Sequence, residues 1–249
     1  MRLKVLTFNT WGAKSFSQQR WPLIGTGLAK LSPDLMGLQE VFSDDQVITL
    51  QKITGMPEIS FVERESGLVI LSRFPIQASK IHRYQAVSPT ESYLRYCQIS
   101  QIQLPERIVI LFVVTHLSWK PEDSAVREKQ IRELLQLIDE NNPARQICIL
   151  AGDFNTTPDS SEIQLLYRAG FADTFASLHP DEPGFTWSHN NPYTASHPEL
   201  PERRIDHIFI QVPRGTVVAT ESSEIVLSQP TAEGVFPSDH FGVLTTFQI

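Results

Sequence analysis

Cysteine and long apolar stretches are what this sequence has least of. Its 249 residues include two cysteines, Cys97 and Cys148, and both sit in apolar or alternating segments. They are expected to be small buried residues, which argues against a disulfide framework and a cysteine metal site. No apolar run approaches the length that spans a bilayer. We therefore expect a protein without a transmembrane segment.

The first residues also lack the features of a secretory signal. Met1-Arg2-Leu3-Lys4 runs directly into a strand-like segment instead of an apolar signal region. A cytoplasmic location is the expectation from this beginning. A signal peptide removed earlier would leave no trace, so an exported mature form stays open.

Positive charge is in deficit as well. Lys and Arg number 21 against 28 Asp and Glu, a formal net charge of −7. This balance argues against strong nonspecific binding to nucleic-acid backbone, although it is compatible with a local basic groove. Clustered carboxylates attract divalent cations. No Gly/Ser-rich linker or low-complexity tract interrupts the chain, which suits one large domain over residues 1–249 or two closely fused halves. A monomer is expected.

What the sequence does contain is an alternation of strand-like and helix-like segments in two similar passes. Strands are predicted at residues 3–8, 35–38, 147–150, 204–210 and 243–247, and helices at 21–31, 47–53 and 126–138. Residues 59–114 instead show five strands separated by turns, which predicts a meander of antiparallel neighbours. Two mixed β-sheets packed face to face, with helices outside, are the expected architecture.

Polar residues stand where these strands end. Asp153 and Asn155 follow the apolar run 147–150, and alternation along an extended backbone puts them on one face. Taken alone, the pair is better explained as a turn that caps the helix beginning near Asp159. The pattern recurs, however, at Asn9, Glu40, His116, Asp206, and Asp239 with His240. Recurrence of the same chemistry at so many strand ends favours a hydrolytic site over a series of turns.

Six motifs carry a resemblance to a known family. They are Thr7-Phe8-Asn9-Thr10-Trp11-Gly12, Leu38-Gln39-Glu40-Val41, Thr115-His116-Leu117, Gly152-Asp153-Phe154-Asn155, Arg204-Ile205-Asp206-His207-Ile208 and Ser238-Asp239-His240-Phe241-Gly242. In this order the chain resembles the endonuclease/exonuclease/phosphatase superfamily, and most of all its DNase I and neutral sphingomyelinase-like branch. The resemblance implies a four-layer α/β sandwich with its site at one edge.

The resemblance also implies a divalent cation. Glu40 would be the main ligand of Mg²⁺ or Mn²⁺, with Asn9 nearby and Asp239 close to the ion or linked to it through water. No other cofactor is implied.

Catalytic roles follow from the same resemblance. Asp153, oriented through Asn155, would position or deprotonate the attacking water. His240, with its ring held by Asp206, would stabilise the phosphorane oxygens. His116 would donate to a phosphate oxygen or to the leaving group.

Several further residues allow more than one interpretation. Arg95 could bind a phosphate or form a cross-strand salt bridge, and Tyr96 is equally undecided. Trp119 could stack on a base, line a pocket or pack in the core. Asn191 could contact substrate from a long exposed loop, residues 188–202, or be solvated there. His207, next to Asp206, is expected to point to the opposite face and to pack.

The function expected is hydrolysis of a phosphodiester in a nucleic acid, a lipid or another small molecule by an activated water. The alternatives are a phosphomonoesterase of an inositol phosphate or other small phosphate, and a catalytically inactive binding module of the same fold.

Overall fold

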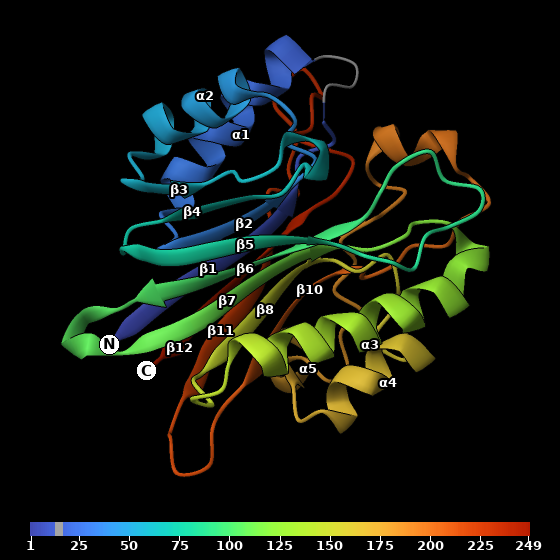
Figure 1. Ribbon diagram of the computed structural model, residues 1–249. Helices are drawn as coiled ribbons and strands as arrows, with labels where there is room; N and C mark the ends of the chain where they lie inside the picture. The colour runs from blue at the N-terminus through green and yellow to red at the C-terminus, as the bar shows by residue number, and fades with distance from the viewer. Residues whose placement is uncertain (13–16) are drawn as a thin grey trace.

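Two mixed six-stranded sheets lie face to face in the computed structural model, which describes residues 1–12 and 17–249 (Figure 1). The first sheet has the strand order β11-β12-β1-β2-β4-β3, and the second has β5-β6-β7-β8-β10-β9. The first sheet contains β1 (Arg2–Asn9), β2 (Leu35–Gln39), β3 (Glu58–Ser60), β4 (Val69–Ser72), β11 (Ala219–Val226) and β12 (Gly242–Gln248). The second contains β5 (Ile76–Arg83), β6 (Tyr96–Gln103), β7 (Val109–His116), β8 (Cys148–Asp153), β9 (Ala172–Asp173) and β10 (Asp206–Gln211).

Helices form the two outer layers. Figure 1 shows α1 (Ser17–Leu31) and α2 (Asp44–Thr54) on the side of the first sheet, and α3 (Ser124–Asn141) and α4 (Ser161–Arg168) on the side of the second. A short helix, α5 (Thr174–Leu178), contacts β10 and β11. The expected four-layer α/β sandwich is thereby confirmed. No helix in the described part of the chain is long and apolar enough to cross a membrane.

Three apolar layers hold these elements together. The layer between the sheets contains Val5 and Ile70 from the first sheet and Val114 and Ile149 from the second, all fully buried. Two further clusters lie under the helices, one beneath α1 and α2 and one beneath α3 and α4. Strands covered on both faces read as nearly continuous apolar runs, which is why their positions were predictable from sequence.

The predicted meander over residues 59–114 is wrong in one respect. β3 and β4 pair antiparallel in the first sheet, whereas β5, β6 and β7 pair antiparallel in the second. The chain crosses between the sheets at residues 73–75. Antiparallel strands have the same period-two pattern in either sheet, so the sequence could not show the crossing.

Strand ends from both sheets meet at one edge. β1 and β2 are parallel and bring Asn9 opposite Gln39, while the parallel pair β7 and β8 sets His116 opposite Asp153. β10 runs antiparallel to β8, so its first residue, Asp206, also lies opposite Asp153. The polar residues predicted at strand ends are therefore delivered to the same edge of the sandwich.

Gly152 makes the approach of β7 and β8 possible. A Cβ atom at this position would lie 2.1 Å from the backbone oxygen of Thr115, and the φ angle of Gly152 is +152°. A backbone oxygen cannot move aside as a flexible side chain can. Only glycine allows Asp153 to stand beside His116 in this register.

Candidate active site

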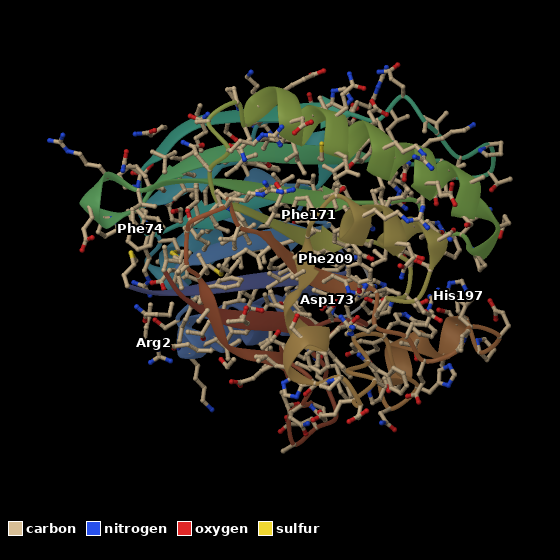
Figure 2. All side chains as sticks on the ribbon, turned by 90° about the horizontal axis from the view of Figure 1, so that it is seen from below. Arg2, Phe74, Phe171, Asp173, His197 and Phe209 are labelled. Carbon is tan, nitrogen blue, oxygen red and sulfur yellow. The ribbon has the colours of Figure 1, made fainter. Side chains whose placement is uncertain are left out.

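The strand ends line a pocket of about 620 Å³. Seven of the eight residues predicted for catalysis or metal binding form part of its wall: Asn9, Glu40, His116, Asp153, Asn155, Asp239 and His240. The eighth, Asp206, is fully buried and contacts His240 from behind. His197 also lines the pocket, and Figure 2 shows it at the opposite end of the molecule from Arg2 and Phe74.

Asp153 lies at the centre of the polar contacts. Its Oδ2 accepts a hydrogen bond from Asn9 Nδ2 at 3.0 Å and lies 3.3 Å from His116 Nε2 and 3.9 Å from His240 Nε2. Its Oδ1 accepts from the backbone N–H of Asn155 at 2.9 Å. Burial alone would raise the pKa of this carboxyl, but the two histidines and Asn9 outweigh it and hold the pKa well below its ordinary value. Asp153 is therefore an anion at neutral pH.

Asn155 reaches Asp153 through its backbone and uses its side chain elsewhere. Its Nδ2 donates to the backbone oxygen of Leu117 at 3.0 Å, which ties the end of β8 to the end of β7. Its φ angle of +53° is unusual for a residue other than glycine, and Trp11 and Glu40 share this left-handed conformation. Such strained backbone at three strand ends is typical of functional sites.

His240 is paired with a carboxylate from β10. Its Nδ1 and Asp206 Oδ2 are 2.9 Å apart, which leaves Nε2 on the side of Asp153. Burial would lower the pKa of His240, but Asp206, Asp153 and Asp239 raise it well above its usual value. His240 is therefore a buried cation, positioned by Asp206.

Glu40 and Asp239 form a second carboxylate pair in the pocket. Burial, together with the nearby Glu40 carboxylate, raises the pKa of Asp239 to about 7. A shared divalent cation would relieve this repulsion, and carboxylate oxygens are the ligands that Mg²⁺ and Mn²⁺ prefer. The donor chemistry of Glu40 and Asp239 thus fits the ion implied by the sequence.

Asn9 forms hydrogen bonds to both Glu40 and Asp153. Its amide oxygen accepts the backbone N–H of Trp11 at 2.9 Å, while its nitrogen donates to Asp153 and, at 3.4 Å, to Glu40. In this orientation the Asn9 nitrogen connects the two carboxylates, and the Asn9 oxygen is occupied by the Trp11 N–H.

A third group of possible ligands occurs among the described residues. Atoms of Asp153, Asp206 and His240 lie within 4.8 Å of one another, close enough to hold an ion. His240 Nδ1 is already hydrogen-bonded to Asp206 at 2.9 Å and its Nε2 lies 3.9 Å from Asp153, so a metal here would compete with these contacts and would require a neutral histidine. Glu40 and Asp239 are the better metal ligands on this ground.

The structure shows where the residues with more than one possible role lie. Arg95 and Trp119 line the pocket. Arg95 pairs with Glu91 at 2.8 Å, within one segment and not across strands, and its Nη1 lies 3.0 Å from His116 Nε2. Trp119 packs against the ring of His197 at 5.4 Å between centroids. Tyr96 belongs to the core between the sheets and is not part of the pocket wall.

Asn191 requires a correction, whereas its loop is largely exposed, as expected. The side chain of Asn191 is fully buried and donates to the backbone oxygen of Ser238 at 2.7 Å, so it does not face substrate from an exposed loop. The loop is mostly exposed, but it contains a 3-10 helix over Pro192–Ser196 and buries Ser188, Asn191, Thr194 and Leu200. Polar composition predicted solvation, but these polar groups are satisfied inside the protein.

His207 packs on the opposite face, as expected. It is buried, stacks on Phe209 with 5.3 Å between ring centroids, and lies 3.4 Å from Asp173. Asp173 also accepts from Arg204 at 2.7 Å, and Figure 2 shows it close to Phe209. This network supports the strand that carries Asp206, but it lies away from the pocket.

Arg203 is a pocket residue that the sequence did not indicate. It precedes Arg204, which turns into the buried network with Asp173. Two adjacent arginines give no sign of which one faces the pocket. Alternation counted back from Asp206 would have placed Arg204, and not Arg203, on the face of Asp206, so it gave no usable signal.

The fold and the site together define a class of protein: a two-sheet α/β sandwich with a carboxylate and histidine site where both sheets end. A comparison with family models finds the same class, since the model described as "Endonuclease/Exonuclease/phosphatase family" matches residues 6–240. The chain belongs to this family.

Individual relatives are more distant. The chain is 28% identical to an inositol phosphosphingolipids phospholipase C of Schizosaccharomyces pombe, over 72% of this chain and 47% of that protein. It is 28% identical to a candidate neutral sphingomyelinase of Drosophila melanogaster, over 100% of this chain and 61% of the relative. With tyrosyl-DNA phosphodiesterase 2 of Mus musculus the identity is 24%, over 98% and 66%. The chain thus spans about half to two thirds of the length of these relatives.

Solved structures share the fold. Among them, a crystal structure of D. rerio TDP2 with a single-strand DNA product has a TM-score of 0.85, 23% sequence identity, and coverage of 100% of this chain and 99% of that one. At this identity the likeness establishes the architecture alone.

Proposed function

We propose that this protein is a divalent-metal-dependent phosphoesterase that hydrolyses a phosphodiester by in-line attack of water. The observation that carries the proposal is the pairing of an ionised Asp153 with a charged His240 in one pocket. An anion that can hold a water and a cation that can hold a phosphate oxygen are the two charges this reaction needs.

Each residue has a role that follows from its contacts. Asp153, fixed by Asn9 and the Asn155 N–H, accepts a hydrogen bond from the attacking water and takes its proton as the new P–O bond forms. His240, fixed by Asp206, donates from Nε2 to a phosphate oxygen where negative charge accumulates. His116, whose Nε2 lies 3.3 Å from Asp153 Oδ2 and 3.0 Å from Arg95 Nη1, would donate to a phosphate oxygen or to the leaving group when substrate replaces these contacts.

Glu40 and Asp239 would hold the Mg²⁺ or Mn²⁺ ion. When bound, this ion supplies positive charge that neutralises the phosphate and stabilises the leaving oxygen. Burial and the nearby Glu40 carboxylate raise the pKa of Asp239 to about 7, which supports this assignment, because a cation would stabilise the ionised form.

A diester is favoured over a monoester because two relatives carry the names of enzymes that cleave phosphodiesters, one in a lipid and one in DNA. One is a phospholipase C of inositol phosphosphingolipids and another is a tyrosyl-DNA phosphodiesterase. The substrate could thus be a lipid or a nucleic acid. A phosphomonoesterase is the alternative within the same chemistry, and an inactive binding module is the alternative outside it.

The test compares bis-p-nitrophenyl phosphate with p-nitrophenyl phosphate, with Mg²⁺, with Mn²⁺ and after chelation. We expect metal-dependent hydrolysis of the diester in preference to the monoester. Faster turnover of the monoester would support the phosphatase alternative, and no turnover of either would support the binding module. Metal-independent turnover would reject the mechanism.

A second assay addresses the substrate. Plasmid DNA, single strands, RNA, sphingomyelin and inositol phosphates are incubated with the protein at two salt concentrations. Cleavage of nucleic acid that falls steeply with salt indicates a nuclease, because phosphate contacts release counterions. Cleavage confined to lipid indicates the other branch.

A further inference from the structure

One arginine in the pocket wall has unused hydrogen-bond donors. The half-buried Arg203 lines the same pocket as Asp153, Asp239 and His240. Its Nε is buried and has no hydrogen-bond partner. Its guanidinium makes no hydrogen bond or ion pair with any residue that the structure describes. A guanidinium carries five N–H donors, and leaving them unmet away from water costs free energy.

The position of Arg203 is nevertheless well defined. Its guanidinium carbon lies 5.1 Å from the centroid of the Trp187 ring, and Trp187 is itself buried. The two backbones are paired as well, with Arg203 N donating to Trp187 O at 2.9 Å and Trp187 N to Arg203 O at 3.0 Å. Stacking on an aromatic face leaves the edge of the guanidinium plane available to a ligand.

Neighbouring arginines show the contrast. Arg95 pairs with Glu91, Arg127 with Glu162 at 3.1 Å, and Arg204 with Asp173, although the buried Nε of Arg204 has no hydrogen-bond partner either. Buried polar groups in native proteins normally have partners, so an exception in a pocket requires an explanation. A ligand in the pocket explains it.

We propose that Arg203 is a substrate-binding residue, which takes oxygens of the substrate's phosphoryl group through its unused N–H donors. The planar donor fork of arginine matches a pair of phosphate oxygens. The choice of phosphate as the anion rests on the proposed function, whereas the availability of the donors does not.

The electrostatic surroundings agree with this role. Burial lowers the pKa of Arg203, and Asp153 and Asp206 act in the opposite direction without contacting it. Arg203 therefore adds a second cation, besides His240, to the pocket that contains Asp153.

The experiment compares wild-type protein with Arg203→Gln and Arg203→Lys, and uses Arg132→Gln as control. The Arg132 side chain is 63% exposed on α3, outside the pocket. Binding of inorganic phosphate in the presence of Mg²⁺ is measured by calorimetry. Hydrolysis of bis-p-nitrophenyl phosphate and the melting temperature are measured on the same samples.

For Arg203→Gln we expect phosphate affinity to fall roughly tenfold or more, the size of a lost hydrogen-bonded ion contact. KM should rise more than kcat falls. Arg203→Lys should be intermediate, because lysine keeps the charge and loses the fork. The melting temperature should stay within about 4 °C of wild type, since the contact with the Trp187 ring is lost but no hydrogen bond or ion pair of the side chain is.

Two results would overturn the assignment. Equal phosphate affinity in wild type and Arg203→Gln, with or without a fall in melting temperature, would give Arg203 a structural role only. Failure of wild-type protein to bind phosphate would remove the ligand altogether. Phosphate binding that depends on Arg203 in a protein that hydrolyses no ester would instead keep this inference and reject the proposed function.

Discussion

Gly152 shows how one residue determines the geometry of the site. Its missing side chain lets β8 approach the Thr115 carbonyl, and the next residue is Asp153. The site therefore depends on a backbone contact that no larger residue permits.

We predict that Gly152→Ala lowers the free energy of unfolding by about 3 kcal/mol, because the added Cβ forces the two strands apart. Hydrolysis should fall with it. Urea denaturation measures the first effect. Gly170→Ala is the matched control, since Gly170 also has a positive φ of +88° but its added Cβ would meet nothing closer than 3.9 Å. Equal losses in the two variants would contradict the close-approach argument.

Asp239 should make the metal-free protein sensitive to pH. Its pKa in the folded state is about 7, against an ordinary value of 3.8. Between these values the folded protein keeps a proton that the unfolded chain has lost, so the free energy of unfolding falls as pH rises through this window. Asp239→Asn should flatten that dependence, measured by urea denaturation with chelator present. Identical pH profiles for wild type and variant would show that Asp239 carries no such proton.

At the scale of elements, the segment 188–202 and the strand ends form one unit. Asn191 donates from the segment to Ser238, and the Ser238 hydroxyl donates to the backbone oxygen of Asn9 at 2.7 Å. The residues that follow Ser238 are Asp239 and His240. The segment thus supports two site residues without contacting substrate through Asn191.

We predict that Asn191→Ala reduces hydrolysis at least tenfold and costs about 1–3 kcal/mol of stability, because it leaves the buried Ser238 carbonyl unsatisfied. Asn190→Ala is the control, since Asn190 is exposed on the same segment. Steady-state kinetics and thermal melting separate the two effects. Normal kinetics in Asn191→Ala would show that the segment does not support the site.

The elements themselves were largely predictable from sequence, and their assignment to sheets was not. The helix α2 was predictable at residues 47–53, and the structure shows that Ser43 with Gln46 caps its start and a left-handed Gly55 ends it. Buried strands were legible from apolar runs. The crossing between β4 and β5 was not, because pairing partners lie far apart in sequence and leave no local pattern.

The candidate site was also predictable only in part. The alternation of side chains along strands and the recurrence of polar residues at strand ends indicated eight candidate site residues, Asp153 among them. Depth below the surface was not predictable for Tyr96 and Asn191, because alternation gives the face of a side chain and not its distance from solvent. Arg203 was missed for the related reason that its partner Trp187 comes from a separate strand-like segment.

Over the whole molecule, the site combines residues from both sheets and from the first and last parts of the sequence. Asn9 and Glu40 come from the first sheet, His116 and Asp153 from the second, and His240 precedes the last strand. Figure 1 shows the two chain ends together at the edge away from these strand ends. The charges that the reaction needs exist only when the entire sandwich is assembled.

The most direct measurement is the rate of Mg²⁺-dependent bis-p-nitrophenyl phosphate hydrolysis by Asp153→Asn and His240→Gln, with melting temperatures recorded in parallel. The central claim is that an ionised Asp153 holds the water and a charged His240 holds the phosphate. It predicts a loss of roughly 100-fold or more in each variant while the fold is kept. Near-normal rates in either folded variant would contradict it.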